Sequence, residues 1–434
     1  MNAEEASLPP GWIKTTLGAI AHVEAGQSPP SSSFTDDPSA VEFLQGNAEF
    51  GEIYPKPIKR TSAPAKFASS NAVLLSVRAP VGATNLSPGR IAIGRGLVAV
   101  ESLAGMDARF LLWLLRYHRQ ALESQATGTT FRAVTGKVVR ALSVALPPLA
   151  EQQRITTRLE QLLSRIAAGR RAFVAAMQGC EKLRAAILGL LADAAFPRAR
   201  IGDIGTVFVG ATPSRNEPAF WGGSIPWVSS GEVAFCRIWA TRERITEDAL
   251  GNRATRLHPP GTVLLAMYGE GKTRGQAAIL NTDAATNQAV AAVRLNRQRM
   301  LPEFLFYCLM HLYDVVRQVG RGGQQINLNG DLVRAIEVPC PPLDTQQELV
   351  RVVRGHLERT AAMEAGMASR IAEVERLRQS VLHQAFRGGL VEHCDADEPA
   401  SQLLSRVRDE QQAIRATGRS GGRARPGTSL GLEQ

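Results

Sequence analysis

The sequence predicts an α+β protein in which two mixed α/β domains are separated by two long helices, packed as an antiparallel coiled coil. The main observation is an internal repeat with an offset of 194 residues. The segment GTTFRAVTGKVVRALSVALPPLAEQQ from Gly128 recurs as GGQQINLNGDLVRAIEVPCPPLDTQQ from Gly322. Two further observations are a seven-residue apolar period after each Pro-Pro, and short apolar runs broken by turn residues before it.

The stretches before each Pro-Pro predict the two globular heads. Short apolar runs bounded by turn residues are typical of strands in a compact, partly antiparallel sheet. We match VLLSV (73–77), IAIG (91–94) and LVAV (97–100) of the first head with VLLAM (263–267), AAIL (277–280) and AVAAV (289–293) of the second. The segments ARFLLWLLRYH and PEFLFYCLMHL, also 194 residues apart, predict one amphipathic helix per head.

Each Pro-Pro starts a long helix, because proline is accepted in the first helical turn but not in the interior. Each helix runs for about 40 residues, or roughly 60 Å. The same register in both copies predicts that the helices pair with each other. The first seam comprises Leu159, Ile166, Phe173, Cys180 and Ile187, with Ile155, Leu163, Met177, Leu183 and Leu190 between them. The second comprises Val353, Thr360, Met367, Val374 and Val381, with Leu349, Leu357, Ile371 and Leu377.

These boundaries predict five segments. They are a first head at 1–146, a helical spacer at 147–196, a second head at 197–340, a second spacer at 341–390, and a short helix with a basic tail at 391–434. The first spacer ends LRAAILGLLADAAF and the second LRQSVLHQAF, a surplus of four residues. Four residues make about one helical turn, so the surplus either lengthens the spacer or belongs to the linker.

Composition and charge narrow the function. The formal net charge of +10 favours a polyanionic partner such as nucleic acid. The polar start MNAEEASLPP and the short apolar runs predict neither signal peptide nor membrane span, and hence a cytoplasmic protein. The five scattered cysteines predict neither a disulfide framework nor a zinc site. We expect no cofactor and no metal in the chain itself.

Catalytic motifs are weak. The segment from Tyr268 to Gly275 resembles part of a phosphate-binding loop, but Ala266 stands where its first glycine is needed. Glu270 and Lys272, with Asp248 upstream, leave open a magnesium-dependent nuclease. The seven histidines show no ligand or triad spacing. We therefore predict a binding protein without catalytic residues, and keep a protein-binding coiled-coil scaffold as another alternative.

The order of head, Pro-Pro-Leu-x-x-Gln-Gln helix, head and second such helix resembles the specificity subunit of type I restriction-modification systems. Further pieces that resemble this family are LPPGWIKTTLGAIAHVEAGQSP, its echo ARIGDIGTVFVGATPSR, FLQGNAEF and IPWVSSGEV. Thr286-Asn287-Gln288-Ala289 belongs with them. The first head departs from the pattern at Gly94-Arg95-Gly96-Leu97, where the second has Asn287-Gln288-Ala289-Val290.

The resemblance implies a non-catalytic subunit whose two target-recognition domains bind a bipartite, asymmetric site in double-stranded DNA. It also implies docking to two methyltransferase subunits and, indirectly, to restriction (translocase) subunits. S-adenosylmethionine, ATP and Mg²⁺ would be bound by those partners. We expect no membrane partner.

Arginine can read guanine, and asparagine or glutamine can read adenine, so polar and cationic residues in turns are the candidates for DNA contact. In the first head these are Gln45, Asn47, Lys59, Arg60, Arg78, Arg95, Arg132 and Lys137. In the second they are Ser229, Ser230, Arg237, Lys272, Arg274, Gln324, Gln325 and Asn327. For partner docking we expect outward-facing residues of the spacers, namely Gln152, Gln153, Gln346 and Gln347.

Overall fold

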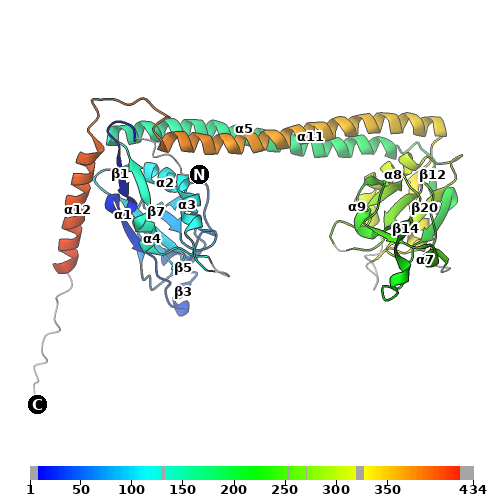
Figure 1. Cartoon of the computed structure of the whole chain (residues 1–434), viewed down its shortest axis with the longest axis horizontal. Helices are drawn as coiled ribbons and strands as arrows, with labels where there is room; N and C mark the ends of the chain where they lie inside the picture. The colour runs from blue at the N-terminus through cyan, green and yellow to red at the C-terminus, as the bar shows by residue number, and fades with distance from the viewer. Residues whose placement is uncertain (1–7, 129–131, 252–254, 270, 319–326, 421–434) are drawn as a thin grey trace, which may run out of the picture. The chain divides into compact units, whose positions relative to one another are not determined.

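A computed structural model describes residues 8–128, 132–251, 255–269, 271–318 and 327–420. The chain forms two compact units, and each unit includes part of both long helices. Unit 1 comprises 1–171 and 371–434, and unit 2 comprises 172–370. Both are mixed α/β structures, as the sequence predicts (Figure 1).

The head of unit 1 is built from three sheets. The central sheet has the order β2-β10-β7-β8, and its strands are β2 (Ala21–Ala25), β10 (Leu97–Ser102), β7 (Val73–Ser76) and β8 (Thr84–Leu86). A second sheet has the order β3-β5-β4-β9-β6, with β3 (Phe34–Thr35), β5 (Lys59–Thr61), β4 (Val41–Leu44), β9 (Ile91–Ile93) and β6 (Phe67–Ala68). A small third sheet pairs β1 (Ile13–Thr16) with β11 (Ser143–Leu146) and so joins the start of the head to its end.

The helices of this head are short except for one. They are α1 (Leu17–Ile20), α2 (Ala108–Tyr117), α3 (Arg119–Ser124) and α4 (Gly136–Ala141). Asp107 caps α2 by accepting a hydrogen bond from the Arg109 backbone N–H, and six consecutive residues of α2 from Phe110 to Leu115 are buried. This is the amphipathic helix that the sequence predicts.

The head of unit 2 repeats this plan. Its central sheet has the order β13-β20-β17-β18-β15, and its second sheet the order β16-β14-β19. The strands are β13 (Gly205–Val209), β14 (Trp221–Val228), β15 (Cys236–Ile238), β16 (Glu243–Ile245), β17 (Val263–Ala266), β18 (Ala277–Leu280), β19 (Ala285–Thr286) and β20 (Val290–Leu295). Strands β12 (Arg198–Arg200) and β21 (Glu337–Pro339) form the small sheet. The helices are α6 (Ile201–Ile204), α7 (Glu247–Gly251), α8 (Pro302–His311), α9 (Tyr313–Gln318) and α10 (Gly330–Ala335).

The central sheet is covered on both faces, which explains its uninterrupted apolar runs. Val73 and Leu75 of β7 lie in the core that includes helix α2, whereas Leu74 lies in a second core shared with β4 and β9. In unit 2, Val263 and Leu264 divide between two cores in the same way. Because strand residues alternate between faces, a strand buried on both faces loses the polar alternation of an exposed strand.

One strand match made from the sequence is wrong. Residues 91–93 (β9) pair in parallel with β4, and the corresponding pair in unit 2 is β19 with β14. Residues 277–280 (β18) form a hairpin with β17, as β8 does with β7. Both runs are short and apolar. Composition alone therefore cannot tell which neighbouring strand each of them pairs with.

The long helices are α5 (Leu149–Gly189) and α11 (Leu343–Phe386). Within unit 1 the start of α5 packs against the end of α11, through Leu159 and Val381. Within unit 2 the end of α5 packs against the start of α11, through Ile187 and Val353. The pairing is therefore antiparallel in each unit, as predicted.

The seven-residue series of seam positions is buried or half-buried throughout, whereas part of the intermediate series is not. Leu183, Leu190 and Leu377 are exposed, contrary to the seam predicted for them, because a two-helix pair shelters only a narrow stripe. Leu188 and Leu191 are buried instead. Helix α5 ends at Gly189 and is followed by the 3-10 helix Leu190–Ala192, whereas α11 runs on to Phe386. The four-residue surplus of the first spacer therefore belongs to the linker and does not lengthen the helix.

After α11 the chain returns to the head of unit 1. Helix α12 (Ala400–Ser420) places Leu403 and Val407 in the same core as α1 and β1. Arg154 of α5 forms an ion pair with Asp397, with Nη2 and Oδ2 2.5 Å apart. The short helix predicted at the end of the chain thus exists and packs on the first head.

Candidate nucleic-acid interface

In the first head, four chain segments meet where strands end. The Gly94 N–H donates to the Leu44 carbonyl at 2.8 Å, which sets the residue after β4 beside the turn after β9. The Val77 N–H donates to the Gly96 carbonyl at 3.0 Å, and the Val134 N–H to the Val77 carbonyl at 2.9 Å. The Ala79 N–H donates to the Arg132 carbonyl at 3.1 Å. We call the resulting surface edge 1 and define it as Gln45, Arg78, Arg95 and Arg132.

The second head contains the same junction. The Asn287 N–H donates to the Val228 carbonyl at 3.0 Å, the Met267 N–H to the Ala289 carbonyl at 2.8 Å, and the Leu328 N–H to the Met267 carbonyl at 3.2 Å. Edge 2 is the surface defined by Ser229, Tyr268, Gln288 and Asn327, each beside one of these bonded residues. The two heads thus offer matching surfaces with different side chains.

The two heads differ in sequence at Gly94-Arg95-Gly96-Leu97 and Asn287-Gln288-Ala289-Val290, but both segments form the same turn. The Leu97 N–H donates to the Gly94 carbonyl at 2.9 Å, and the Val290 N–H to the Asn287 carbonyl at 3.1 Å. Each tetrapeptide is therefore the turn that leads into β10 or β20. The two turns occupy equivalent places although their residues differ.

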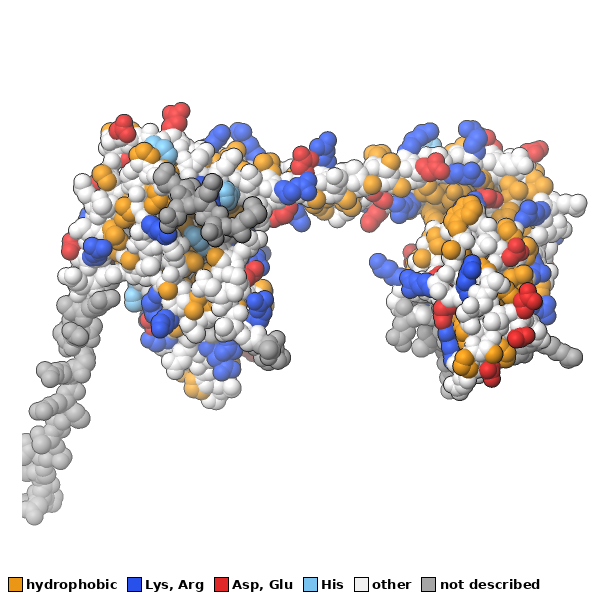
Figure 2. All heavy atoms as spheres, in the orientation of Figure 1, with side chains coloured by type: hydrophobic (Ala, Val, Ile, Leu, Met, Phe, Trp, Pro, Cys, Tyr) orange, Lys and Arg blue, Asp and Glu red, His pale blue; other side chains and the backbone are white. Residues whose placement is uncertain are grey.

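The cations of edge 1 are available to a ligand. Arg78, Arg95 and Arg132 are exposed, and none forms an ion pair with a carboxylate among the described residues. Arg132 Nη2 does donate a long hydrogen bond of 3.4 Å to the Glu123 carbonyl. Two other arginines differ, because Arg109 pairs with Glu160 at 2.7 Å and Arg119 with Glu123 at 2.8 Å. Three unneutralised guanidinium groups on one surface attract phosphate or the acceptor atoms of bases. On the face that Figure 2 shows, Lys and Arg side chains also gather around the region of β3 and β5.

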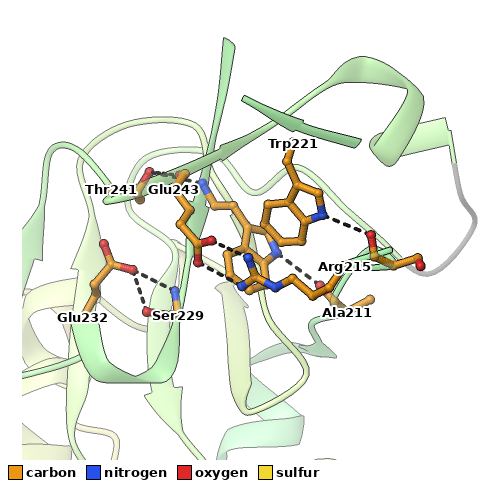
Figure 3. A network of polar contacts seen from close by, with 9 residues as sticks. Ala211, Arg215, Trp221, Ser229, Glu232, Thr241 and Glu243 are labelled. Atoms are coloured by element: carbon orange, nitrogen blue, oxygen red, sulfur yellow. Dashed lines mark hydrogen bonds and ion pairs between the residues drawn. The ribbon is translucent and has the colours of Figure 1, made fainter. Parts of the chain in front are cut away.

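An internal polar network supports edge 2 (Figure 3). The Arg215 guanidinium lies over the Trp221 ring, 3.8 Å from its centroid, and makes two hydrogen bonds to the carboxylate of Glu243. These hydrogen bonds lower the pKa of Glu243 and raise that of Arg215. Ser229 donates its hydroxyl to Glu232 at 2.8 Å, and its backbone N–H to the same oxygen at 2.9 Å. Ser229, predicted to contact DNA, therefore also fixes the turn after β14.

Several predicted contacts lie away from these edges or are held internally. Arg60 donates to Glu42 and to the Ala40 carbonyl, and Lys59 lies 5.9 Å from the Phe34 ring centroid. Arg237 is on β15, where it pairs with Glu303 at 2.7 Å. Arg274 is buried, and its Nη2 donates to the Arg317 carbonyl at 3.0 Å. Internal partners make these three arginines poor candidates for base contact.

The remaining predicted residues are varied in position. Asn47 follows Gln45 in the loop after β4, and Lys137 is exposed on α4. Ser230 begins the 3-10 helix beside Ser229, and Lys272 is exposed in the turn between β17 and β18. Gln324 and Gln325 lie outside the described residues.

Tyr268, Gln288 and Arg242 are not among the contacts that the sequence predicts. In the sequence, Gln288 stands out only within a motif that resembles the family, and Tyr268 only within a segment that resembles a phosphate-binding loop. Arg242 is exposed, and its backbone N–H donates to Glu232 at 2.9 Å. The repeat already aligns Gln288 with Arg95, a predicted contact, and this alignment is the signal that could have selected Gln288.

Half of the predicted docking set faces inward, which corrects that prediction. Gln152 and Gln346 are both 0% exposed. The Gln152 amide donates to the Pro147 carbonyl at 2.9 Å, and the Gln346 amide to the carbonyls of Pro341 and Arg299 at 2.8 and 2.9 Å. These buried glutamines satisfy backbone groups where head and helix meet. Gln153 and Gln347 are exposed, as predicted.

The nuclease alternative gains no geometric support. Asp248 is on α7, which packs on β14, whereas the turn of Lys272 packs on α9, since the Tyr313 hydroxyl donates to the Lys272 carbonyl at 2.5 Å. Glu270 lies outside the described residues.

Within the described ranges, no three His, Cys, Asp or Glu side chains are grouped as metal ligands. All five cysteines are free. No helix in the described part of the chain is long and apolar enough to cross a membrane.

Solved structures share this fold. A chain from a structural study of complex assembly and conformational transition in the type I restriction-modification system aligns with a TM-score of 0.74, at 22% identity, covering 89% of this chain and 100% of that one. The HsdS subunit of Thermoanaerobacter tengcongensis aligns with a TM-score of 0.57, at 21% identity, covering 89% and 99%.

Relatives found by sequence are also named as specificity subunits of type I restriction enzymes. The putative type I restriction enzyme MjaX specificity subunit of Methanocaldococcus jannaschii is 39% identical over 163 residues, which are 37% of this chain and 38% of that protein. The match thus spans well under half of that relative. The EcoBI specificity subunit of Escherichia coli is 23% identical over 71% of this chain and 72% of its own. The family model described as the type I restriction modification DNA specificity domain matches residues 9–173 and 198–373. Since both matches together cover most of the chain, this protein belongs to the type I restriction modification DNA specificity domain family and carries two copies of that domain.

Proposed function

We propose that this protein is the DNA specificity subunit of a type I restriction-modification complex. Each head binds one half of a bipartite, asymmetric target in double-stranded DNA. The observation that carries the proposal is that edges 1 and 2 share their backbone hydrogen bonds but differ in their side chains. A common framework with unlike side chains suits the reading of two unlike half-sites.

The chain supplies recognition and its partners supply chemistry. Two methyltransferase subunits would bind S-adenosylmethionine, and restriction subunits would use ATP and Mg²⁺. Gln153 and Gln347 are exposed on the first turns of α5 and α11, next to buried glutamines that fix the junction of head and helix. An exposed residue at a rigid junction is a suitable docking position.

A head exchange tests the proposal. The chain is expressed with its methyltransferase in a host that lacks other DNA methylation, and single-molecule sequencing reports the methylated motif. Replacing residues 197–340 with the corresponding head of a family member should change one half-site and leave the other intact. A motif unchanged by the exchange, or methylation without any bipartite motif, would contradict the proposal.

A further inference from the structure

We propose that the turn before β10 or β20 carries the principal base-reading side chain of each head. In the first head Arg95 reads a guanine, and in the second Gln288 reads an adenine. This inference rests on the proposed function and specifies the base that each edge selects.

Neighbouring backbone segments pack closely against both turns. Gly26 and Gly210 lie in the segments after β2 and β13, where a Cβ atom would collide with the carbonyls of Gly94 and Asn287 respectively. A Cβ on Gly96 would lie 2.6 Å from the Gln45 carbonyl oxygen. Close backbone packing therefore fixes the base of each turn, while the second residue of the turn projects a polar side chain. A pre-positioned side chain loses little entropy on binding.

Arg95 has the properties of a guanine reader. Its side chain is exposed and has no carboxylate partner among the described residues, and only its backbone N–H is engaged, by Ser28 Oγ at 3.4 Å. The same Ser28 hydroxyl accepts a hydrogen bond from Gln45 Nε2 at 2.9 Å. A free guanidinium can donate two parallel hydrogen bonds to the O6 and N7 atoms of guanine. Arg78 belongs to the same edge and is exposed, which suits a contact with phosphate.

Gln288 has the properties of an adenine reader. The Thr212 hydroxyl donates to its Oε1 atom. That contact orients the amide. Nε2 has no partner in the described part of the chain and can donate, and Oε1 keeps a second lone pair to accept. These are the two functions that adenine N7 and N6 require. Thr212 acts here as a positioning residue, since it touches the amide rather than the base.

Methylome sequencing of point variants tests this inference. The variants are Arg95→Gln, Arg95→Lys and Gln288→Arg, each expressed with the methyltransferase. Arg95→Gln should reduce methylation of the original motif roughly 10- to 100-fold and relax or change one guanine position in one half-site only. Gln288→Arg should alter one adenine position in the other half-site. Arg95→Lys keeps the charge, so it should retain partial preference for guanine.

A phosphate contact would give a different result. Loss of a phosphate contact weakens binding to all sequences alike and lowers the salt dependence by about one counterion. An unchanged motif with uniformly weaker binding would therefore overturn the inference for Arg95. Thr212→Val is a second check on Gln288, because it should weaken the adenine preference while keeping the salt dependence. If the wild type shows a bipartite motif that responds to head exchange, failure of these variants refutes the turn alone and not the proposed function.

Discussion

At the residue scale, internal partners decide which predicted arginines can contact DNA. Arg237 is neutralised by Glu303, and Arg60 by Glu42, whereas Arg78 has no described carboxylate partner. Sequence patterns place all three in turns or at strands and cannot separate them. The structure therefore divides the predicted contacts into structural and available side chains.

This division predicts the salt dependence of DNA binding. Arg78→Ala should weaken binding and lower the slope of log K against log salt by about 0.9, the value for one phosphate contact. Arg237→Ala is the matched control and should leave the slope unchanged, because its guanidinium is already paired. Fluorescence anisotropy over a salt series measures both. Equal slopes for the two variants would contradict the assignment.

A buried histidine predicts pH-dependent stability in unit 2. Burial, with Arg294 and Arg256 nearby, lowers the pKa of His258 from 6.5 to about 4. The neutral ring accepts a hydrogen bond from Arg294 Nε at its Nδ1 atom, 3.2 Å away. The unfolded imidazole binds a proton below about pH 6.5, but the folded one does so only near pH 4. Stability is therefore full above 6.5 and falls between 6.5 and 4, by up to roughly 3 kcal/mol.

Urea unfolding at several pH values measures this loss. His258→Asn keeps an acceptor for Arg294 but cannot titrate, so the variant should lose this part of the pH dependence. His118, whose pKa burial also lowers to about 4, supplies a similar slope in unit 1 and remains in the variant. An identical slope in wild type and variant would show that His258 does not contribute.

At the element scale, the seven-residue period correctly identifies the main stripe of each long helix. It cannot show how wide the sheltered stripe is, which depends on the partner helix and the head beneath it. Leu159 is 0% exposed and contacts the core of unit 1, whereas Leu183 is 47% exposed. Both are leucines of the same helix at predicted seam positions.

The two leucines therefore predict different costs. Leu159→Ala should lower the free energy of unfolding by about 2–5 kcal/mol through lost burial and a residual cavity. Leu183→Ala should cost under about 1 kcal/mol, because much of its side chain already contacts water. Chemical denaturation followed by circular dichroism compares them. Similar losses would mean that the seam extends to Leu183.

Helix α12 is an element that the repeat does not account for. Its Leu403 is 1% exposed within the core of unit 1, and Gln411 donates to the Gly18 carbonyl of α1 at 3.1 Å. Leu403→Ala should therefore speed amide hydrogen exchange in Leu17–Ile20 by releasing α12. Exchange in the matching helix Ile201–Ile204 of unit 2 should not change, and mass spectrometry follows both. Unchanged exchange at α1 would contradict a stabilising role.

At the scale of the whole molecule, two copies of one domain bring two different edges into a single chain. Duplication retains the backbone junctions, because they depend on strand pairing, and allows the turn residues to vary. Under the proposed function, methyl transfer and cleavage are carried out by partner subunits. The chain itself should be a reader of DNA.

This predicts no turnover by the purified chain. Incubation with DNA, S-adenosylmethionine, ATP and Mg²⁺ should give neither methyl transfer nor cleavage, and added partner subunits should restore activity at bipartite sites. Radiolabelled methyl transfer and gel electrophoresis measure the two reactions. Cleavage by the chain alone that Lys272→Ala abolishes would favour the nuclease alternative.

Sequence patterns alone predict the duplication, the paired long helices, the strands near residues 73, 97, 263 and 290, and one amphipathic helix per head, and the structure contains all of them. These features are periodic or repeated, and short-range patterns report them well. The sequence also indicates Gln45, Arg78, Arg95 and Arg132 as separate candidates without joining them. No local pattern connects residues so far apart in the chain.

Folding determines which candidate residues share a surface and which are neutralised by internal partners. Edge 1 forms because backbone hydrogen bonds join four segments, and matching bonds show that the aligned turns of Arg95 and Gln288 occupy equivalent places despite their different residues. Likewise, Gln152 is buried because its amide satisfies the Pro147 carbonyl, although its polarity alone predicts exposure. Burial and pairing depend on the partners that a side chain meets after folding, and those partners are distant in sequence.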